Sequence, residues 1–224
     1  METADSELFL DEYGPLCKKI RVLHVAETAG AVDTYLKILL RYSSSDRIEN
    51  ILVCSKDYDI RDYRGLTDSV ERIHMERTDS VLEEGRSIRK LREIIGRYSP
   101  DIVYAHSYRA GMLLRIADIG IRNRVLYNPH GWSYNRLSDP DRRNRRLTAE
   151  KMLALFTDMV ICGSVSEKMS AIKLGIVPEK KLIVIPEPTG LHSASEHFTY
   201  AIRSDGKKMT EQTEELYERL VWDA

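Results

Sequence analysis

The chain has 224 residues, of which 42% are hydrophobic and 31% are charged, so it has the composition of an ordinary globular protein with room for one large α/β domain. Its formal net charge is -1, so no global positive field would attract nucleic acid, and we expect no nucleic-acid partner. The three cysteines are odd in number, far apart and without metal-ligand spacing, which argues against a disulfide framework and against a zinc site (Cys17, Cys54 and Cys162).

The beginning of the chain carries no membrane or secretion signal that we recognise. Residues 1–19 are acidic and lack the basic-then-apolar order of a signal peptide, so we interpret them as an N-terminal extension. No apolar run approaches the ~20 residues that a membrane-spanning helix needs. Together with the unpaired cysteines, this predicts a cytoplasmic protein.

Seven short apolar runs follow in chain order, and most are continuous rather than alternating. Continuous runs are typical of strands buried on both faces of a parallel sheet. Segments with helical periodicity separate most of them, which is typical of a doubly wound α/β sheet. We therefore predict one Rossmann-like domain over residues 20–190 with a mostly parallel sheet of about seven strands, at residues 20–26, 50–55, 71–75, 101–105, 124–128, 158–163 and 181–186.

Two of the predicted helices begin with a recognisable cap. Residues 80–98 open with Ser80 followed three residues later by Glu83, the pattern of a capping box, and residues 164–175 open in the same way. In the first of these helices one face is apolar and should pack on the sheet (Ile88, Leu91, Ile95 and Tyr98).

Ligands of open α/β sheets bind outside the carboxyl ends of the strands, where the connecting loops converge. Here the loops in question are residues 27–33, 106–111, 128–135 and 186–190. We therefore expect a functional site at this edge.

The loop after the first strand runs through Ala29, Gly30 and Ala31 directly into a predicted helix. Exposed N–H groups and the helix dipole at such a start favour an anion, and glycine lets a phosphate approach the backbone. A single glycine is not a dinucleotide fingerprint. A tight turn that uses small residues for packing remains the alternative.

Two further loops contain histidine. His106 and Ser107 follow the fourth strand, where His106 is expected to face a ligand and Ser107 either does so or caps the next helix. Pro129 and Gly131 flank His130, and together they would aim its ring outward from the end of the fifth strand. An imidazole there could donate to a sugar hydroxyl or stabilise developing charge. The alternative for His130 is a structural hydrogen bond to a backbone carbonyl.

An arginine-rich segment, residues 136–147, comes next and reads as a solvated, mobile connector. With Trp132 and Tyr134 just before it, it could instead touch an anionic membrane surface or a phosphorylated acceptor.

Four segments, in this order and at these intervals, resemble the N-terminal half of GT-B glycosyltransferases of the family 4 type that build capsule and exopolysaccharide. They are "HVAETAGAVDTYLKILL", "PDIVYAHSYRAGMLLRIA", "LYNPHGWSY" and "DMVICGSVSEKMSAIKLGIVPEKKLIVIPEPTG".

The resemblance implies a retaining glycosyltransferase that uses a nucleotide sugar as co-substrate, with no metal or other cofactor. In its terms Ala29, Gly30 and Ala31 lie against the donor phosphates, and His130 is the catalytic residue beside the transferred sugar. The acceptor-side residues would be His106, Ser107, Trp132 and Tyr134, facing a sugar or lipid-linked acceptor.

The chain also departs from the family pattern. Two adjacent glycines are usual where Gly30 and Ala31 stand, and Glu187 with Pro188 replaces an asparagine–glycine turn. Residues 191–224 are too few for a second Rossmann-like half, so we expect the donor-binding domain to be lacking. The end of this tail resembles the last helix of full-length relatives, which packs back on the first domain; a generic amphipathic tail is the alternative.

Three hypotheses follow. The first is an acceptor-side domain that works with a separate donor-binding chain, in the cytoplasm or peripherally at the inner face of the membrane. The second is a non-catalytic remnant or regulatory binding module, and the third is an unrelated nucleotide-binding Rossmann-like protein. Because donor positioning would be incomplete, we expect negligible transferase activity from the isolated chain.

Overall fold

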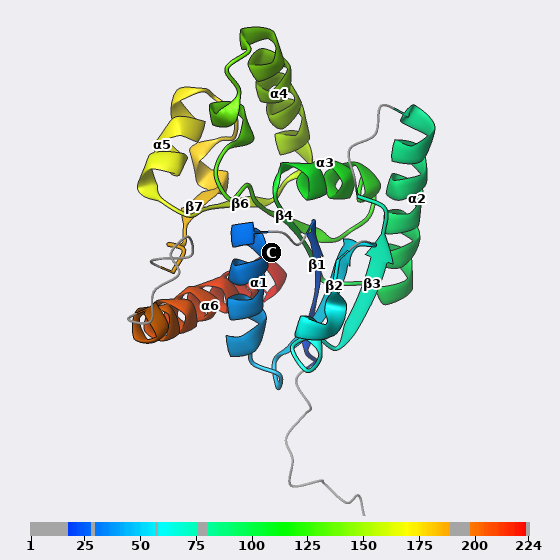
Figure 1. The fold of residues 1–224 in the computed structure, drawn as a ribbon, viewed down its shortest axis with the longest axis vertical. Helices are drawn as coiled ribbons and strands as arrows, with labels where there is room; N and C mark the ends of the chain where they lie inside the picture. The colour runs from blue at the N-terminus through cyan, green and yellow to red at the C-terminus, as the bar shows by residue number, and fades with distance from the viewer. Residues whose placement is uncertain (1–17, 28–29, 57, 76–79, 189–197, 223–224) are drawn as a thin grey trace, which may run out of the picture.

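The computed structural model describes residues 18–27, 30–56, 58–75, 80–188 and 198–222, with the backbone alone for 198–202. Seven parallel strands form one sheet in the order β3-β2-β1-β4-β5-β6-β7 (Figure 1). The predicted fold class is confirmed, and each predicted strand is found to within two residues at either end. The strands are β1 (Ile20–Ala26), β2 (Ile48–Ser55), β3 (Ser69–Ile73), β4 (Ile102–His106), β5 (Arg124–Asn128), β6 (Met159–Cys162) and β7 (Leu182–Val184).

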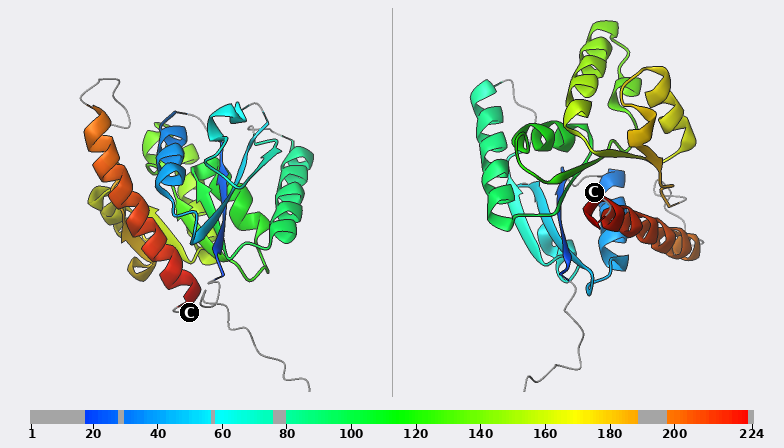
Figure 2. Two further views of the ribbon diagram at one scale, coloured as in Figure 1. Left: turned by 90° about the horizontal axis from the view of Figure 1, so that it is seen from below. Right: turned by 180° about the vertical axis from the view of Figure 1, so that it is seen from behind.

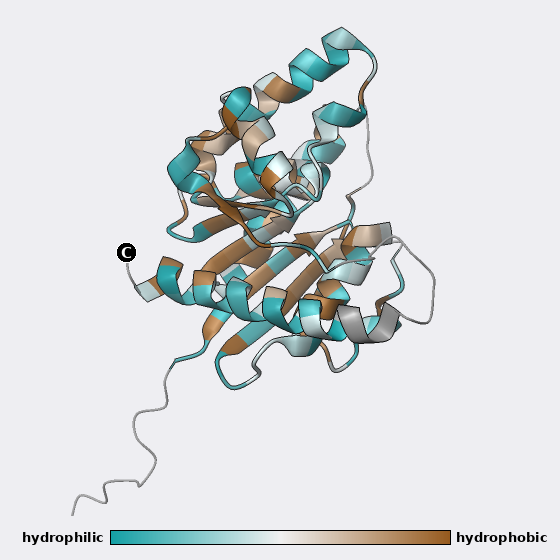
Figure 3. Ribbon diagram, turned by 90° about the vertical axis from the view of Figure 1, so that its left-hand side faces the viewer, coloured by the Kyte–Doolittle hydropathy of each residue, from teal (hydrophilic) through white to brown (hydrophobic). Residues whose placement is uncertain are grey.

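Both faces of the sheet are covered, which explains why the strands are apolar without alternation. Residues such as Leu23 and Val25 pack with α2 (Val81–Tyr98) and α3 (Tyr108–Ala117). Val22 packs toward the opposite face, with α1 (Gly30–Tyr42) and α6 (Phe198–Trp222). Figure 2 shows α1 and α6 on one side of the sheet and α2 on the other. In Figure 3 the strands behind α6 are largely hydrophobic, whereas α6 itself carries many hydrophilic residues.

Local sequence signals set the ends of two helices as predicted. The Ser80 side chain accepts a hydrogen bond from the Glu83 N–H at the start of α2. Ser164 caps α5 (Val165–Lys173) in the same manner, accepting from the Glu167 N–H at 3.2 Å. On the predicted apolar face of α2, Leu91 is fully buried.

The arginine-rich segment is not a mobile connector, and that prediction is wrong. It begins α4 (Pro140–Leu153), because Asp139 accepts from the first free N–H groups and Pro140 occupies a position where no N–H is needed. Most of its charged side chains stay solvated, while Glu150 and Leu153 are buried.

The last helix, α6, packs along α1 and β1. Its buried face includes Met209, Leu216 and Tyr217. Glu214, on the same helix, accepts hydrogen bonds from the Ser44 N–H at 2.7 Å and the Ser43 hydroxyl at 3.1 Å. These contacts fix α6 to the turn between α1 and β2.

Across the part of the chain that the structure describes, no helix combines the length and the apolar character needed to span a bilayer.

Candidate functional site

The strands all run in the same direction, so their carboxyl ends lie along one edge of the sheet, and a pocket of about 440 Å³ opens there. Residues from three of the predicted loops line it: Glu27 after β1, Ser107 after β4 and His130 after β5. From the fourth loop, Glu187 contacts His130. The sheet topology therefore brings these distant segments together.

Gly30 is the first residue of α1, and it is exposed. Its φ is 59°, a left-handed backbone conformation that residues with a Cβ adopt only at an energetic cost. A Cβ placed at this position would meet nothing within 4 Å among the described residues. Ala31 is half-buried in the first turn. Ala29 lies outside the described residues.

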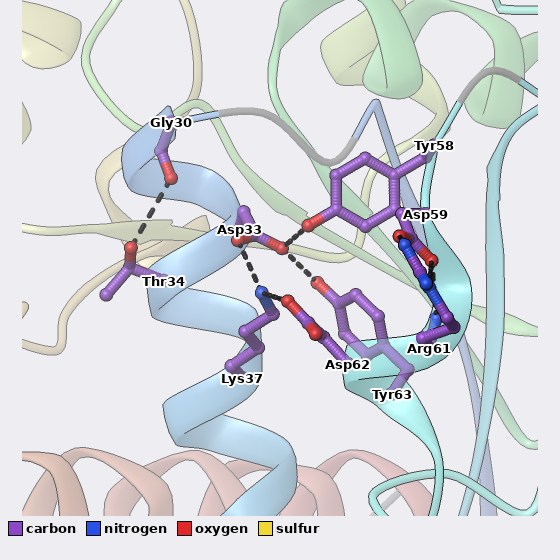
Figure 4. A network of polar contacts seen from close by, with 9 residues as sticks. All are labelled: Gly30, Asp33, Thr34, Lys37, Tyr58, Asp59, Arg61, Asp62 and Tyr63. Atoms are coloured by element: carbon purple, nitrogen blue, oxygen red, sulfur yellow. Dashed lines mark hydrogen bonds and ion pairs between the residues drawn. The ribbon is translucent and has the colours of Figure 1, made fainter.

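A polar network holds the start of α1 against the segment after β2 (Figure 4). The Asp33 carboxylate accepts from the hydroxyls of Tyr58 and Tyr63 and pairs with Lys37 at 2.9 Å. Burial and the hydrogen bond to Asp33 raise the pKa of Tyr58 to about 12, so this hydroxyl remains a donor. The carboxylate is thereby committed to protein donors.

His130 lines the pocket, and its side chain is only 6% exposed. Its backbone has a φ of 48°, and its N–H donates to the Asn128 side chain at 2.9 Å, a local turn that the sequence Asn-Pro-His-Gly sets up. Ring Nδ1 lies 2.7 Å from a carboxylate oxygen of Glu187, and Nε2 lies 3.2 Å from Nδ1 of His106. Both ring nitrogens therefore have protein partners, and the ring is largely buried rather than facing outward as expected.

His106 is fully buried, so the prediction that it faces a ligand is wrong. It is the last residue of a central strand, and its ring continues inward to His24 of β1, with Nε2 at 3.1 Å from Nδ1 of His24. His24 in turn bonds the Asn50 side chain at 3.0 Å. Three imidazole rings thus form a continuous hydrogen-bonded chain from the core to the rim of the pocket.

The inner two rings are held uncharged. Desolvation by burial lowers the pKa of His24 to about 4, against a smaller opposing effect of its hydrogen bond to Asn50. Burial also places the pKa of His106 well below its ordinary value, and its two histidine neighbours add to the effect.

Ser107 does cap the helix that follows it, since its Oγ accepts from the Ala110 N–H of α3. The same hydroxyl donates to Glu27 Oε2 at 2.9 Å. Its φ of 88° is in the left-handed region, which turns the chain sharply at the rim. Ser107 therefore lines the pocket and joins two of its loops.

Trp132 and Tyr134 do not face the pocket, so their predicted contact with an acceptor is wrong. Trp132 is 2% exposed and donates from Nε1 to the carbonyl of Glu167, while Tyr134 is fully buried and bonds the Ser170 hydroxyl. The rings stack with centroids 5.7 Å apart. They anchor the loop after β5 to α5, because burying two large aromatic side chains is more favourable than leaving them exposed to water.

The polar lining of the pocket mixes both signs of charge. Arg136 donates to the carbonyl of His130 at 3.4 Å, and Arg146 of α4 lies 3.7 Å above the ring of Tyr108. Arg109, which is buried, also lines the pocket and pairs with Glu84. Such a lining can bind sugar hydroxyls through carboxylates and phosphate oxygens through guanidinium groups.

Sequence reasoning missed three of these residues as site components. His24 and Glu187 contact the other histidines only through the fold, although a histidine inside the apolar run 20–26 was a signal of an internal partner. Arg146 was read only as part of a charge run. Within the described residues, no group of three or more histidine, cysteine, aspartate or glutamate side chains could hold a metal ion.

Comparison with known proteins identifies a family for the chain. Residues 32–190 match the model of Glycosyltransferase Family 4. No curated protein matches the chain.

Solved structures similar to the chain share its fold. HepE from Anabaena, in complex with UDP and glucose, is 20% identical with a TM-score of 0.58, and the match covers 80% of this chain and 48% of HepE. The lipopolysaccharide outer core galactosyltransferase WaaB is 15% identical with a TM-score of 0.58, covering 76% and 46% of the two chains. UDP-GlcNAc 2-epimerase from Neisseria meningitidis, bound to UDP-GlcNAc, is 16% identical with a TM-score of 0.54 and the same coverage as WaaB. The chain spans about half the length of each.

Proposed function

The chain belongs to Glycosyltransferase Family 4, and from this membership we propose that its described domain forms one wall of the active site of an enzyme that transfers sugar from a nucleotide-sugar donor. The observation that carries the proposal is that the family match, residues 32–190, includes most of the pocket's lining, His130 among it, together with Glu187, which contacts His130. We assign the transfer to polysaccharide or glycoconjugate synthesis, and we expect the configuration at the anomeric carbon to be retained.

We place the donor phosphates at the start of α1. The backbone N–H groups of the first turn and the positive end of the helix dipole suit an anion, and Gly30 leaves the backbone open to it. In the transfer step the bond from the anomeric carbon to the diphosphate breaks, a bond to an acceptor oxygen forms, and the acceptor's proton leaves with the phosphate. Fixed N–H donors stabilise the negative charge that develops on the leaving group.

We place the acceptor in the pocket between Glu27, Ser107 and Arg136. A second hollow of about 330 Å³ adjoins it at Tyr108 and Arg146 and adds the guanidinium groups of Arg142 and Arg145. This chemistry favours an acceptor that carries a phosphate, free or on a lipid, and peripheral contact with an anionic membrane. Co-sedimentation with anionic liposomes at low and high salt tests the membrane contact.

The opposite wall must come from a second, donor-binding lobe, either on a further part of the polypeptide or on a separate chain. Holding the donor from both sides is a matter of positioning, which contributes up to ~7–11 kcal/mol of barrier lowering. We therefore expect negligible turnover from the 224-residue chain alone.

The alternative is a regulatory or binding module that engages sugar ligands without catalysis. The engagement of both His130 nitrogens by Glu187 and His106 favours it.

A transfer assay distinguishes the two. A panel of nucleotide sugars is offered with and without a donor lobe, and binding of each sugar nucleotide is measured in parallel by calorimetry. Turnover that needs the lobe and falls at least ~100-fold in His130→Gln supports the enzyme, with Arg97→Gln on the distant end of α2 as the matched surface control. Binding without turnover, lobe included, supports the module, and turnover at ordinary rates by the chain alone contradicts the two-lobe assignment.

A further inference from the structure

A file of hydrogen bonds crosses the domain from α6 to the rim of the pocket. It begins at the buried carboxylate of Glu214 and ends at Glu187, and each link is between 2.7 and 3.2 Å long. We name the part from Asn50 to Glu187 the histidine relay. In order, the members of the whole file are Glu214, Ser43, Asn50, His24, His106, His130 and Glu187.

The α6 end fixes the direction of the file. A carboxylate only accepts, and Glu214 already receives the Ser44 N–H and an N–H of Arg47, each at 2.7 Å. The single hydroxyl proton of Ser43 therefore points to Glu214, at 3.1 Å. The Ser43 oxygen is left to accept from the amide nitrogen of Asn50 at 2.9 Å, which turns the amide oxygen of Asn50 toward His24.

That direction passes from ring to ring. Because the Asn50 oxygen accepts, Nε2 of His24 must carry a proton, and its Nδ1 is left as an acceptor. His106 then donates from Nε2 to His24 and accepts at Nδ1 from Nε2 of His130. Only Nδ1 of His130 remains, and it faces the carboxylate of Glu187.

The relay needs one proton more than neutral rings supply. Each of the four links around the three imidazoles requires a proton, and three neutral imidazoles carry only three. Since burial holds the pKa values of His24 and His106 far below the ordinary value, the inner rings do not take the additional proton. It belongs to the outer pair.

We propose that Asn50, His24 and His106 are positioning residues which, oriented by Ser43 and Glu214, hold His130 with a proton on Nε2 and a second proton shared between its Nδ1 and Glu187. The groups that face this ring from the surrounding elements are Tyr35 and His106, whose rings pack on it, the carboxylates of Glu187 and Glu167, and the guanidinium group of Arg136. Nδ1 is then the one nitrogen that can exchange its partner for a ligand. If the proposed function holds, this pair can keep or release one proton beside the reacting sugar.

The reverse direction is a definite competitor. If the Asn50 amide were turned over, all three rings would carry their proton on Nδ1, Glu187 would accept from a neutral His130, and no additional proton would be needed. The cost would be the hydrogen bond between Ser43 and Glu214. The two arrangements predict opposite tautomers at every ring.

Nitrogen-15 NMR of the imidazole rings decides between them, since two-bond proton–nitrogen correlations distinguish rings protonated at Nε2, at Nδ1 or at both. To leave only the three relay rings, His74, His192 and His197 are replaced by glutamine. At pH 7 we expect His24 and His106 as Nε2–H tautomers, and His130 with Nε2–H and a strongly hydrogen-bonded proton at Nδ1. Nδ1–H tautomers at His24 and His106 would overturn the proposal.

Two variants test the causes. Glu187→Gln offers an amide donor to Nδ1, so His130 should lose the additional proton and become a neutral Nε2–H ring while the inner rings stay unchanged. Ser43→Ala frees the Asn50 amide to turn, and we expect the rings to change to the Nδ1–H set, whereas Ser44→Ala beside it leaves them as they are. An unchanged spectrum in Ser43→Ala overturns the role of α6, and an unchanged His130 in Glu187→Gln overturns the shared proton.

If Ser43→Ala does not fold, the spectrum of the parent protein and that of Glu187→Gln still decide the matter. None of these readouts involves sugar transfer. A failed transfer assay would therefore leave the relay standing, and wrong tautomers would leave the proposed function standing.

Discussion

Replacing Glu150 by alanine should destabilise the domain strongly, because its buried carboxylate pairs with the buried guanidinium group of Arg115. Its carboxylate accepts from Arg115 Nη2 at 2.9 Å and from the Tyr127 hydroxyl at 2.8 Å, and both charged side chains are 1% exposed. The guanidinium group also lies 4.0 Å over the ring of Tyr127. Without the carboxylate, an unpaired cation and an unpaired hydroxyl remain in the core.

The expected loss follows from the burial of both partners. Breaking a buried ion pair from one side costs about 3–5 kcal/mol, since the remaining charge stays desolvated. In urea, with a slope of about 3 kcal/mol per M for a domain of this size, the unfolding midpoint should fall by roughly 1–1.7 M. In a thermal scan the expected decrease in Tm is on the order of 10 °C.

Equilibrium unfolding followed by circular dichroism measures this, and a double variant provides the control. Arg115→Met combined with Glu150→Leu removes both charges and keeps the volume filled, so it should recover most of the loss. If Glu150→Ala costs less than about 1 kcal/mol, or if the double variant is as unstable as the single one, the reasoning from an unpaired buried charge is refuted.

Three further outcomes are expected. Gly111→Ala should cost about 1–3 kcal/mol of unfolding free energy, because a Cβ there would lie 2.5 Å from the ring of Tyr127. Gly96→Ala is the control and should not destabilise the protein, since a Cβ there would meet nothing within 4 Å, and thermal unfolding compares the two variants. Trp132→Ala should cost about 3–5 kcal/mol of unfolding free energy, as for a core residue, and a stable variant would contradict its burial. His24 has a folded pKa of about 4 against an ordinary 6.5, so its contribution to the stability of the folded state is complete above pH 6.5. As the pH falls toward 4, the free energy of unfolding should decrease by on the order of 3 kcal/mol, which urea unfolding across that pH range measures.

The pH series needs one internal control. Burial raises the pKa of Asp118 to about 6, so this carboxyl stabilises as the pH falls and opposes the histidine effect. The comparison is therefore between the parent protein and His24→Gln under identical conditions. Equal pH dependence of the two proteins would show that His24 is not held neutral by the fold.

The candidate site divides into what local patterns could reveal and what they could not. The positions of His130 in the loop after β5 and of Gly30 at the start of α1 were predictable, because a strand followed by Pro-His-Gly or by a small-residue helix start is a signal within a few residues. The burial of His106 was not, since the same residue at a strand end is consistent with either orientation. The helix α4 was missed because its charge run hides a cap that only Asp139 and Pro140 indicate.

By itself the sequence determined the class of fold, the strands and the edge at which the connecting loops meet, because continuous apolar runs, capping residues and glycines act over short stretches of chain. Only the tertiary structure decided which side chains at that edge turn outward. Trp132 and Tyr134 went to the core, and His24, His106, His130 and Glu187 joined across 24 to 82 residues of sequence. The reason is physical: a ring nitrogen that leaves water must find a partner, and which partner lies within hydrogen-bonding distance depends on strand order and helix packing, which the neighbouring residues do not determine.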